Sequence, residues 1–242
     1  MSTRTRVRSA ITLLATGAGL AAGVYGAYAA NTWYRYGRVA ERDEDQEDEL
    51  LDHYMPRYEV VERHHIRVAA PPAVTLAAAR EQDLLQLPLV RPLFKTREIV
   101  LRATPDDRPL PRGLVAATLA LGWGILADVP DRELVVGAVT KPWEPNVAFR
   151  ALPPDEFAGY SEPGFVKIAW TLRADPAGEH TSIFRTETRA VATDATARTR
   201  FRRYWALASP GITLMRRLSL RPLKLEAERR AAASRLPQPE RA

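Results

Sequence analysis

The stretch PGFVKIAWTLRADPAGEHTSIFRTETRAVATDATARTRFRRYWALA, residues 163–208, decides the fold of this chain. Apolar and polar side chains alternate along 166–173, which is typical of a strand with one buried face. Asp175 to Gly178 has the composition of a turn. Residues 181–191 are rich in Thr, Ile, Phe and Val, which favour a second strand. Together these features predict a β-hairpin whose inward face includes Trp170.

A long helix is expected directly after the hairpin. Asp194 stands at the N-cap position. Apolar residues then recur at helical spacing, namely Phe201, Tyr204, Trp205 and Ala208. Ser209-Pro210-Gly211 predicts a kink or break before residues 212–225 continue the helix. A hairpin that leads into such a helix is typical of the closing half of a helix-grip fold.

The preceding residues predict a strand, two short helices and a meander of strands. The expected strands are 58–68, 97–103, 121–127, 133–140, 146–152 and 156–160, and the expected short helices are 73–80 and 82–87. This order predicts the α+β class. We expect a helix-grip domain over residues 57–229, with a curved antiparallel sheet wrapped around the long C-terminal helix.

The composition excludes several kinds of chemistry. The 242 residues contain no Cys, so disulfides, thiolate nucleophiles and Cys-based metal sites are impossible. His64 and His65 are adjacent on a predicted strand and therefore face opposite sides. We predict no metal site, no cofactor and no assigned catalytic residue, because the hydrolase elbow and the usual nucleotide-binding motifs are also missing.

The net charge of +6 belongs to the two ends of the chain. Residues 1–40 contain five Arg and no acid, and residues 194–242 contain 12 basic and four acidic side chains. The body between 53 and 193 is balanced, which argues against nucleic-acid binding. The basic C-terminal helix predicts either a solvated face or contact with anionic lipid headgroups.

The N-terminus contains an uncharged run from residue 9 to residue 34, preceded by Arg4, Arg6 and Arg8. A bilayer-spanning helix needs about 20 mainly apolar residues, so we predict a single-pass transmembrane anchor over residues 1–36. A signal peptide with a processing site at Ala27-Tyr28-Ala29 is the first alternative. A soluble core helix is the second, and the side of the membrane that holds the domain stays open.

Two further segments are expected to lie outside the domain. Residues 41–52 contain eight acids, which favours a hydrated spacer over residues 37–56. The last residues, 230–242, are expected to form a disordered tail.

The order of elements resembles the START-like superfamily of polyketide cyclases, dehydrases and lipid-transport proteins, abbreviated SRPBCC. Four motifs resemble a membrane-anchored bacterial branch of it: GWGILADVPDRELVVGAVTKPW (122–143), PGFVKIAWTLRA (163–174), TETRAVATD (186–194) and FRRYW (201–205). The resemblance implies a cavity between the sheet and the C-terminal helix. It also implies ligand binding, and in some members catalysis.

Ten residues are expected to line that cavity. They are Trp123, Trp143, Glu144, Phe149, Trp170, Phe184, Thr186, Thr188, Tyr204 and Trp205. Large aromatic side chains give a ligand site apolar walls, although the same residues could instead form a filled core. Glu187 is expected on the opposite face with Arg185 and Arg189, where pairing of charges is the ordinary role.

The sequence therefore predicts a membrane-tethered domain that binds a lipid or other apolar small molecule. An enzyme of the cyclase/dehydratase type, acting on a polyketide-like substrate, is the alternative, and a non-catalytic scaffold is a third. An enzyme should bring at least two titratable groups together inside the cavity. The sequence indicates no strong pair of this kind, so we expect binding rather than catalysis.

Overall fold

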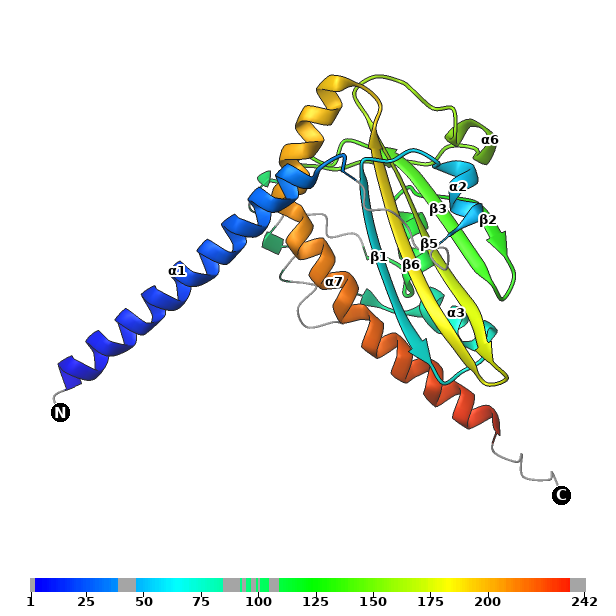
Figure 1. The fold of residues 1–242 in the computed structure, drawn as a ribbon, viewed down its shortest axis with the longest axis horizontal. Coiled ribbons are helices and arrows are strands. Elements are labelled where there is room, and N and C mark those ends of the chain that lie inside the picture. The colour runs from blue at the N-terminus through cyan, green and yellow to red at the C-terminus, as the bar shows by residue number, and fades with distance from the viewer. Residues whose placement is uncertain are drawn as a thin grey trace.

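The computed structural model describes residues 3–38, 47–84, 92, 95, 96, 99, 101–104 and 109–235. In this part of the chain one six-stranded antiparallel sheet has the order β1-β6-β5-β3-β2, and β4 pairs with β3. The strands are β1 Val60–Val68, β2 Gly124–Val129, β3 Glu133–Thr140, β4 Phe149–Arg150, β5 Val166–Gly178 and β6 Thr181–Ala192. The sheet and the long helix that crosses it confirm the α+β helix-grip prediction (Figure 1).

The β5–β6 hairpin forms as predicted, but its turn lies later in the chain. Asp175 pairs with Ile183 and Pro176 with Ser182, so the segment expected to turn is still extended. A bulge between Pro176 and Gly178 accommodates the proline, and Gly178 has a φ of +148° that favours glycine. The turn therefore contains only Glu179 and His180.

Helix α7, Ala195–Arg235, follows the hairpin directly. The Asp194 carboxylate caps it by accepting hydrogen bonds from the backbone N–H groups of Thr196 at 2.7 Å and Ala197 at 3.0 Å. The helix does not break at Pro210, so that part of the prediction is wrong. It does change direction between its yellow first turns and its orange remainder (Figure 1). A proline has no N–H to donate to the preceding turn, which permits such a bend.

The C-terminal boundary of the domain needs a correction. Helix α7 continues to Arg235, and Ala231 is buried against the core. Residues 230–235 are therefore part of the folded domain rather than of a disordered tail. The rest of that predicted tail lies outside the described residues.

Three other expectations differ from the structure. Ile99 and Leu101 are helical where a strand was expected over 97–103. The segment expected as a strand over 156–160 begins with helix α6, Pro154–Phe157, because prolines suit the first turn of a helix and Phe157 packs into the core. Helix α5, Leu114–Ala120, was not predicted. Helix α3, Pro72–Glu81, matches the expectation for 73–80, whereas most of the helix expected over 82–87 lies outside the described residues.

The inner face of the sheet packs against α7 and α3 in two apolar groups. Near the middle and end of α7, Leu223 and Ala227 contact a group of sheet residues that includes Trp170 and Phe184. Near its start, Phe201 and Trp205 contact Val60, Val166 and Ala190. Trp170 is only 7 % exposed, so it faces inward as predicted.

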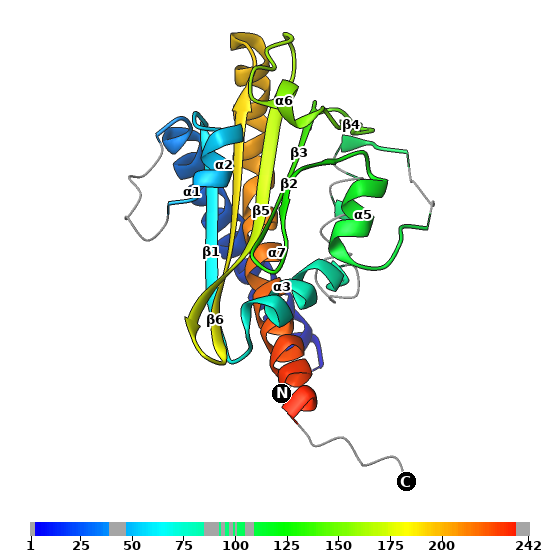
Figure 2. The same ribbon diagram turned by 90° about the vertical axis from the view of Figure 1, so that its right-hand side faces the viewer.

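The outer face is covered by helix α2, Glu49–Tyr54, and by α6 (Figure 2). Leu51 and Met55 are fully buried against it. The expected spacer over residues 37–56 is therefore corrected: its second half folds onto the sheet, and residues 39–46 lie outside the described residues.

An ionic network fixes α2 to the outer face. The buried Arg189 donates hydrogen bonds to the carboxylates of Glu187 and Asp52, both at 2.6 Å, and to the carbonyl of Met55 at 2.8 Å. Glu187 also pairs with Arg63 at 2.9 Å. Glu187 thus lies outside the cavity face and pairs its charge, as predicted.

Helix α1, Thr3–Arg35, crosses α7 with its own C-terminal end, and the rest of α1 extends away from the sheet (Figure 1). Arg202 of α7 donates hydrogen bonds to the Trp33 carbonyl at 2.8 and 3.0 Å, and the Tyr25 hydroxyl contacts the Leu207 carbonyl. In the described residues no helix combines the length and the hydropathy needed to cross a bilayer. The predicted transmembrane helix is thus not found there, since Gly and Ala lower the hydropathy of α1.

A pair of buried carboxyl groups joins α2 to β3. Asp48, which caps α2 by accepting the Leu51 N–H at 2.7 Å, is 5 % exposed, and Glu133 is 3 % exposed. Burial and then the Asp48 carboxyl raise the pKa of Glu133 to about 8, against the opposing effects of Arg173 and Arg132. Glu133 is therefore protonated in the folded protein at neutral pH.

This pair predicts that the protein loses stability as pH rises from about 4.5 to about 8. A folded-state pKa above the ordinary value of 4.5 stabilises the fold fully below that value, and the contribution disappears as pH rises through about 8. Glu133→Gln, which stays neutral, should flatten this decline in the free energy of unfolding measured by denaturant titration across that range. The exposed control Glu179→Gln should decline like the wild type. A Glu133→Gln protein with the wild-type pH profile would contradict this account.

Trp170 should be a major source of stability. Trp170→Ala leaves a cavity in the packed inner face and should lower the free energy of unfolding by about 3–5 kcal/mol. The control Leu121→Ala, at a side chain that is 43 % exposed, should change it by less than about 1 kcal/mol. Equal effects of the two substitutions would show that Trp170 is not packed as described.

Candidate ligand-binding site

Polar side chains interrupt the apolar inner face at the middle of the sheet. On β1, Glu62 and His64 occupy inward positions between Val60 and Ile66. Their partners on β6 are Thr188 and Thr186 respectively. Because paired residues of adjacent strands share a face, these four side chains form one polar area.

Helix α7 places polar residues opposite this area. Its sheet-facing positions run from Phe201 and Trp205 through Ser209, Thr213 and Arg216 to Leu220 and Leu223, at steps of three or four. A guanidinium nitrogen (Nη1) of Arg216 lies 3.5 Å from the Thr186 hydroxyl oxygen. We call these residues the central polar cluster: Glu62, His64, Thr186, Thr188, Ser209, Thr213 and Arg216.

The central polar cluster is buried but poorly satisfied. Within the described structure, shielded atoms with no hydrogen-bond partner include His64 Nε2, Arg216 Nε and the hydroxyls of Thr188, Ser209 and Thr213. These three hydroxyl residues are each at most 9 % exposed. A buried polar atom without a partner destabilises a protein by about 1–3 kcal/mol. Such a concentration between a sheet and a helix is typical of a site that a bound molecule completes.

Two opposite charges lie in this cluster. Burial lowers the pKa of Arg216 to about 10, and the nearby Glu62 carboxylate acts in the opposite direction. The Glu62 carboxylate is also 3.5 Å from His64 Nε2, and the His64 side chain is 8 % exposed. The charges of Glu62 and Arg216 therefore offset each other.

The predicted aromatic residues lie on the two sides of this cluster rather than around one cavity. Towards the C-terminal part of α7, Trp123 lies 4.9 Å from Phe149 and 6.4 Å from Trp170, measured between ring centroids. Trp123, Trp170 and Phe184 belong to the same packed group. At the other side Trp143 and Tyr204 pack with Trp205.

The three polar predictions have separate positions. Thr186 and Thr188 are in the central polar cluster, and Thr186 also donates a hydrogen bond to the Thr171 carbonyl at 2.7 Å. Glu144 is exposed on the turn after β3, 3.9 Å from the Lys141 ammonium. The structure therefore places Glu144 outside the cluster.

Five members of the cluster were not predicted from the sequence. Glu62 and His64 could have been recognised from strand alternation, because they share a face with Val60 and Val68. Ser209, Thr213 and Arg216 continue the helical spacing of Phe201 and Trp205. Pro210-Gly211 instead predicts a break at this point of the helix.

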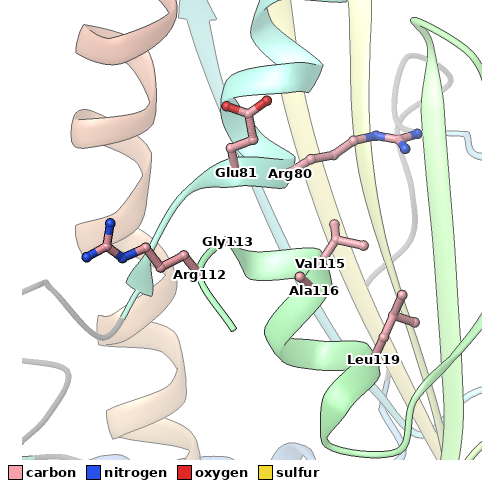
Figure 3. A pocket seen from close by; sticks show the side chains of 7 residues that line it. All are labelled: Arg80, Glu81, Arg112, Gly113, Val115, Ala116 and Leu119. Carbon is pink, nitrogen blue, oxygen red and sulfur yellow. The ribbon is translucent and has the colours of Figure 1, made fainter. Parts of the chain in front are cut away.

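Two open hollows lie elsewhere in the described structure, and several of the charged side chains that line them are paired. The first, of about 530 Å³, lies between α3 and α5 and is lined by Arg80, Glu81, Arg112, Gly113, Val115, Ala116 and Leu119. Figure 3 shows its charged side chains pointing apart, and Arg80 pairs with Asp128 while Glu81 pairs with Arg230 at 2.8 Å.

The second hollow, of about 520 Å³, lies where α1 meets α7. Arg198 pairs there with Glu59, and the Tyr36 hydroxyl donates to the same carboxylate at 2.7 Å. Arg202 lies 4.3 Å above the Trp33 ring. The central polar cluster is therefore the better candidate site. No group of three or more His, Asp or Glu suited to a metal is present in the described residues.

Comparison with known proteins gives distant structural similarity only. No family model matches this chain, and no curated protein matches it in sequence. A conserved protein from Geobacillus kaustophilus is 9 % identical with a TM-score of 0.32, covering 72 % of this chain and 97 % of its own. CalU16 from Micromonospora echinospora is 13 % identical with a TM-score of 0.24, covering 72 % and 97 %.

The Zhui aromatase/cyclase from Streptomyces sp. R1128 is 15 % identical with a TM-score of 0.27, covering 73 % of this chain and 98 % of its own. An aromatase/cyclase is thus among the similar structures, whereas none of the comparisons supports the membrane-anchored branch. With every TM-score below 0.5, the fold assignment rests on the strand order and register, and the candidate site rests on its own residues.

The unsatisfied hydroxyls give the site a testable signature. Thr213→Val removes a buried unpartnered hydroxyl at nearly constant shape, so it should raise the free energy of unfolding by about 1–3 kcal/mol in ligand-free protein. Thr75→Val is the matched control, because the Thr75 hydroxyl is hydrogen-bonded to Ser182 at 2.8 Å and its loss should destabilise the fold. Destabilisation by both substitutions would indicate that Thr213 is satisfied in the folded protein.

Proposed function

We propose that this helix-grip domain binds an apolar small molecule with a polar group between its sheet and α7. The observation that carries the proposal is the central polar cluster, which lies between two apolar groups and in which five shielded polar atoms have no hydrogen-bond partner in the described structure. Ligand sites in proteins are mainly apolar, with a few placed polar groups that fix the orientation of the ligand. The similar arrangement here would direct the polar group of a ligand to the middle of the sheet.

The polar atoms restrict the chemistry of that group. Arg216 Nε can only donate a hydrogen bond, and the hydroxyls of Thr188, Ser209 and Thr213 can also donate. The ligand should therefore present acceptor oxygens. Because the Glu62 and Arg216 charges offset each other, an additional buried carboxylate would be uncompensated. We therefore favour an uncharged carbonyl or hydroxyl compound, a class that includes lipid alcohols and polyketide-like molecules.

Binding can be tested with an uncharged probe. The dye Nile red should bind the purified full chain, and hexadecanol should displace it better than palmitate does. Arg216→Met should weaken the binding of Nile red and of hexadecanol at least about tenfold, because it removes the donor at the centre of the site and leaves the Glu62 charge without its counterpart. Arg217→Met, at the exposed neighbouring position, is the control and should bind like the wild type.

Native mass spectrometry of the protein as purified supplies an independent measurement. A co-purified apolar compound that is present in the wild type and absent from Arg216→Met would support the proposal. The proposal fails if Nile red does not bind, or if Arg216→Met and Arg217→Met bind it equally.

One observation favours a second function, acid–base catalysis in the same site. His64 and Glu62 are titratable groups 3.5 Å apart with Arg216 nearby, so at least two such groups come together in the central polar cluster, as acid–base catalysis requires. In this case His64→Gln should abolish the conversion of a polyketide-like surrogate while Nile red still binds. Conversion at the wild-type rate by His64→Gln, or none by the wild type, would leave binding as the function.

A further inference from the structure

The face of α7 turned away from the sheet has a stripe of exposed leucines and arginines. The members of this outer stripe are Arg200, Arg203, Leu207, Leu214, Arg217, Arg221 and Leu225. At about 100° per residue these positions fall within an arc of about 100°, on the opposite side from the sheet-facing residues. The leucines at 207, 214 and 225 are 59 %, 44 % and 57 % exposed.

The charge of this stripe has one sign. From Ala195 to Leu225 the helix contains no acidic residue, and the first acid is Glu226. Along this face two arginines, two leucines, two more arginines and a third leucine follow one another, so apolar side chains lie close to cationic groups. This is the pattern of an amphipathic helix that lies in the interface of an anionic membrane, with leucines entering the acyl boundary and arginines meeting phosphates.

We propose that the outer stripe of α7 docks the protein on an anionic lipid surface. Charge complementarity favours this partner over a second copy, because a two-fold contact through the stripe would set arginines against arginines. It also favours lipid over nucleic acid, because phosphate contacts would use the arginines but leave the leucines exposed. This proposal does not depend on the function proposed above.

Docking in this way would also orient the domain. The other side of α7 contributes Ser209, Thr213 and Arg216 to the central polar cluster and packs against the inner face of the sheet. A helix with its side chains is about 10 Å thick. The proposed ligand site would therefore lie about one helix diameter from the lipid headgroups.

Vesicle sedimentation of the full chain tests the proposal. Vesicles of phosphatidylcholine with about one-third phosphatidylserine should bind the protein, and vesicles of phosphatidylcholine alone should bind it much less. The triple variant Arg203→Gln/Arg217→Gln/Arg221→Gln should reduce partitioning to anionic vesicles by about tenfold to a hundredfold. The reason is that each basic residue near such a surface contributes separately to the partitioning. The double variant Leu207→Ser/Leu214→Ser should also weaken it.

A matched variant controls for net charge. Arg57→Gln/Arg112→Gln/Arg132→Gln removes the same charge from exposed positions outside α7 and should bind like the wild type. Equal losses in the two triple variants would overturn the proposal, because charge alone would then decide binding. Unchanged binding of the stripe variants would also overturn it, since α1 or another surface would then hold the protein. Preferential binding of the wild type to a DNA duplex present in competition would replace lipid by nucleic acid.

Discussion

Helix α7 lies across one face of the sheet along 41 residues, and the positions of the other elements follow from this contact. Its two ends bury apolar side chains at about 25 cal/mol per Å² of surface removed from water, which is the driving force for closing the sheet around the helix. Between those ends the helix presents Ser209, Thr213 and Arg216 to Glu62, His64 and Thr188. The apolar ends therefore hold together a middle that would not be stable alone.

The outer face of the sheet buries a charge that must be paired. Arg189, fully buried, would strongly destabilise the sheet if its charge were unpaired, and the short helix α2 supplies the Asp52 carboxylate and the Met55 carbonyl that pair with it. Asp48 and Glu133 add a second contact that stabilises α2 only while Glu133 holds its proton. Residues from α2 thus pair the Arg189 charge, although Arg189 Nη2 and Glu133 Oε1 have no hydrogen-bond partner among the described residues. On the inner face of the described structure, five such atoms gather in the central polar cluster.

The parts of the fold that alternation and capping encode could be predicted from the sequence. The alternating inward residues of β5 and the N-cap at Asp194 are local sequence patterns. Each is enough to predict the local structure that forms. The turn could not be placed, because Pro176 and Gly178 fit an extended bulge as well as a turn. Helix α2 could not be predicted from its acidic composition, since what stabilises it is Arg189, more than a hundred residues away in the sequence.

For the site, the sequence indicates Thr186 and Thr188 but not their partners, because its aromatic residues are the stronger signal of an apolar ligand site. In the structure the aromatics fill the two packed groups beside the cluster, as side chains with much apolar area do wherever a helix meets a sheet. The polar residues at inward positions were more informative than the aromatics, since a sequence rarely places Glu, His and Arg at core positions without a function.

Several local rules are broken in the same short stretch of α7. Pro210 occupies a helix interior, Ser209 and Thr213 bury hydroxyls without partners, and Arg216 loses part of its hydration. Each of these features destabilises the fold, and each would be avoided by an Ala or Leu at the same position. Their coincidence at one level of the sheet, opposite Glu62 and His64, is more easily explained by one common use than by four separate defects. A ligand that pairs the unpartnered atoms would stabilise the folded state, so we expect binding and folding to be coupled in this protein.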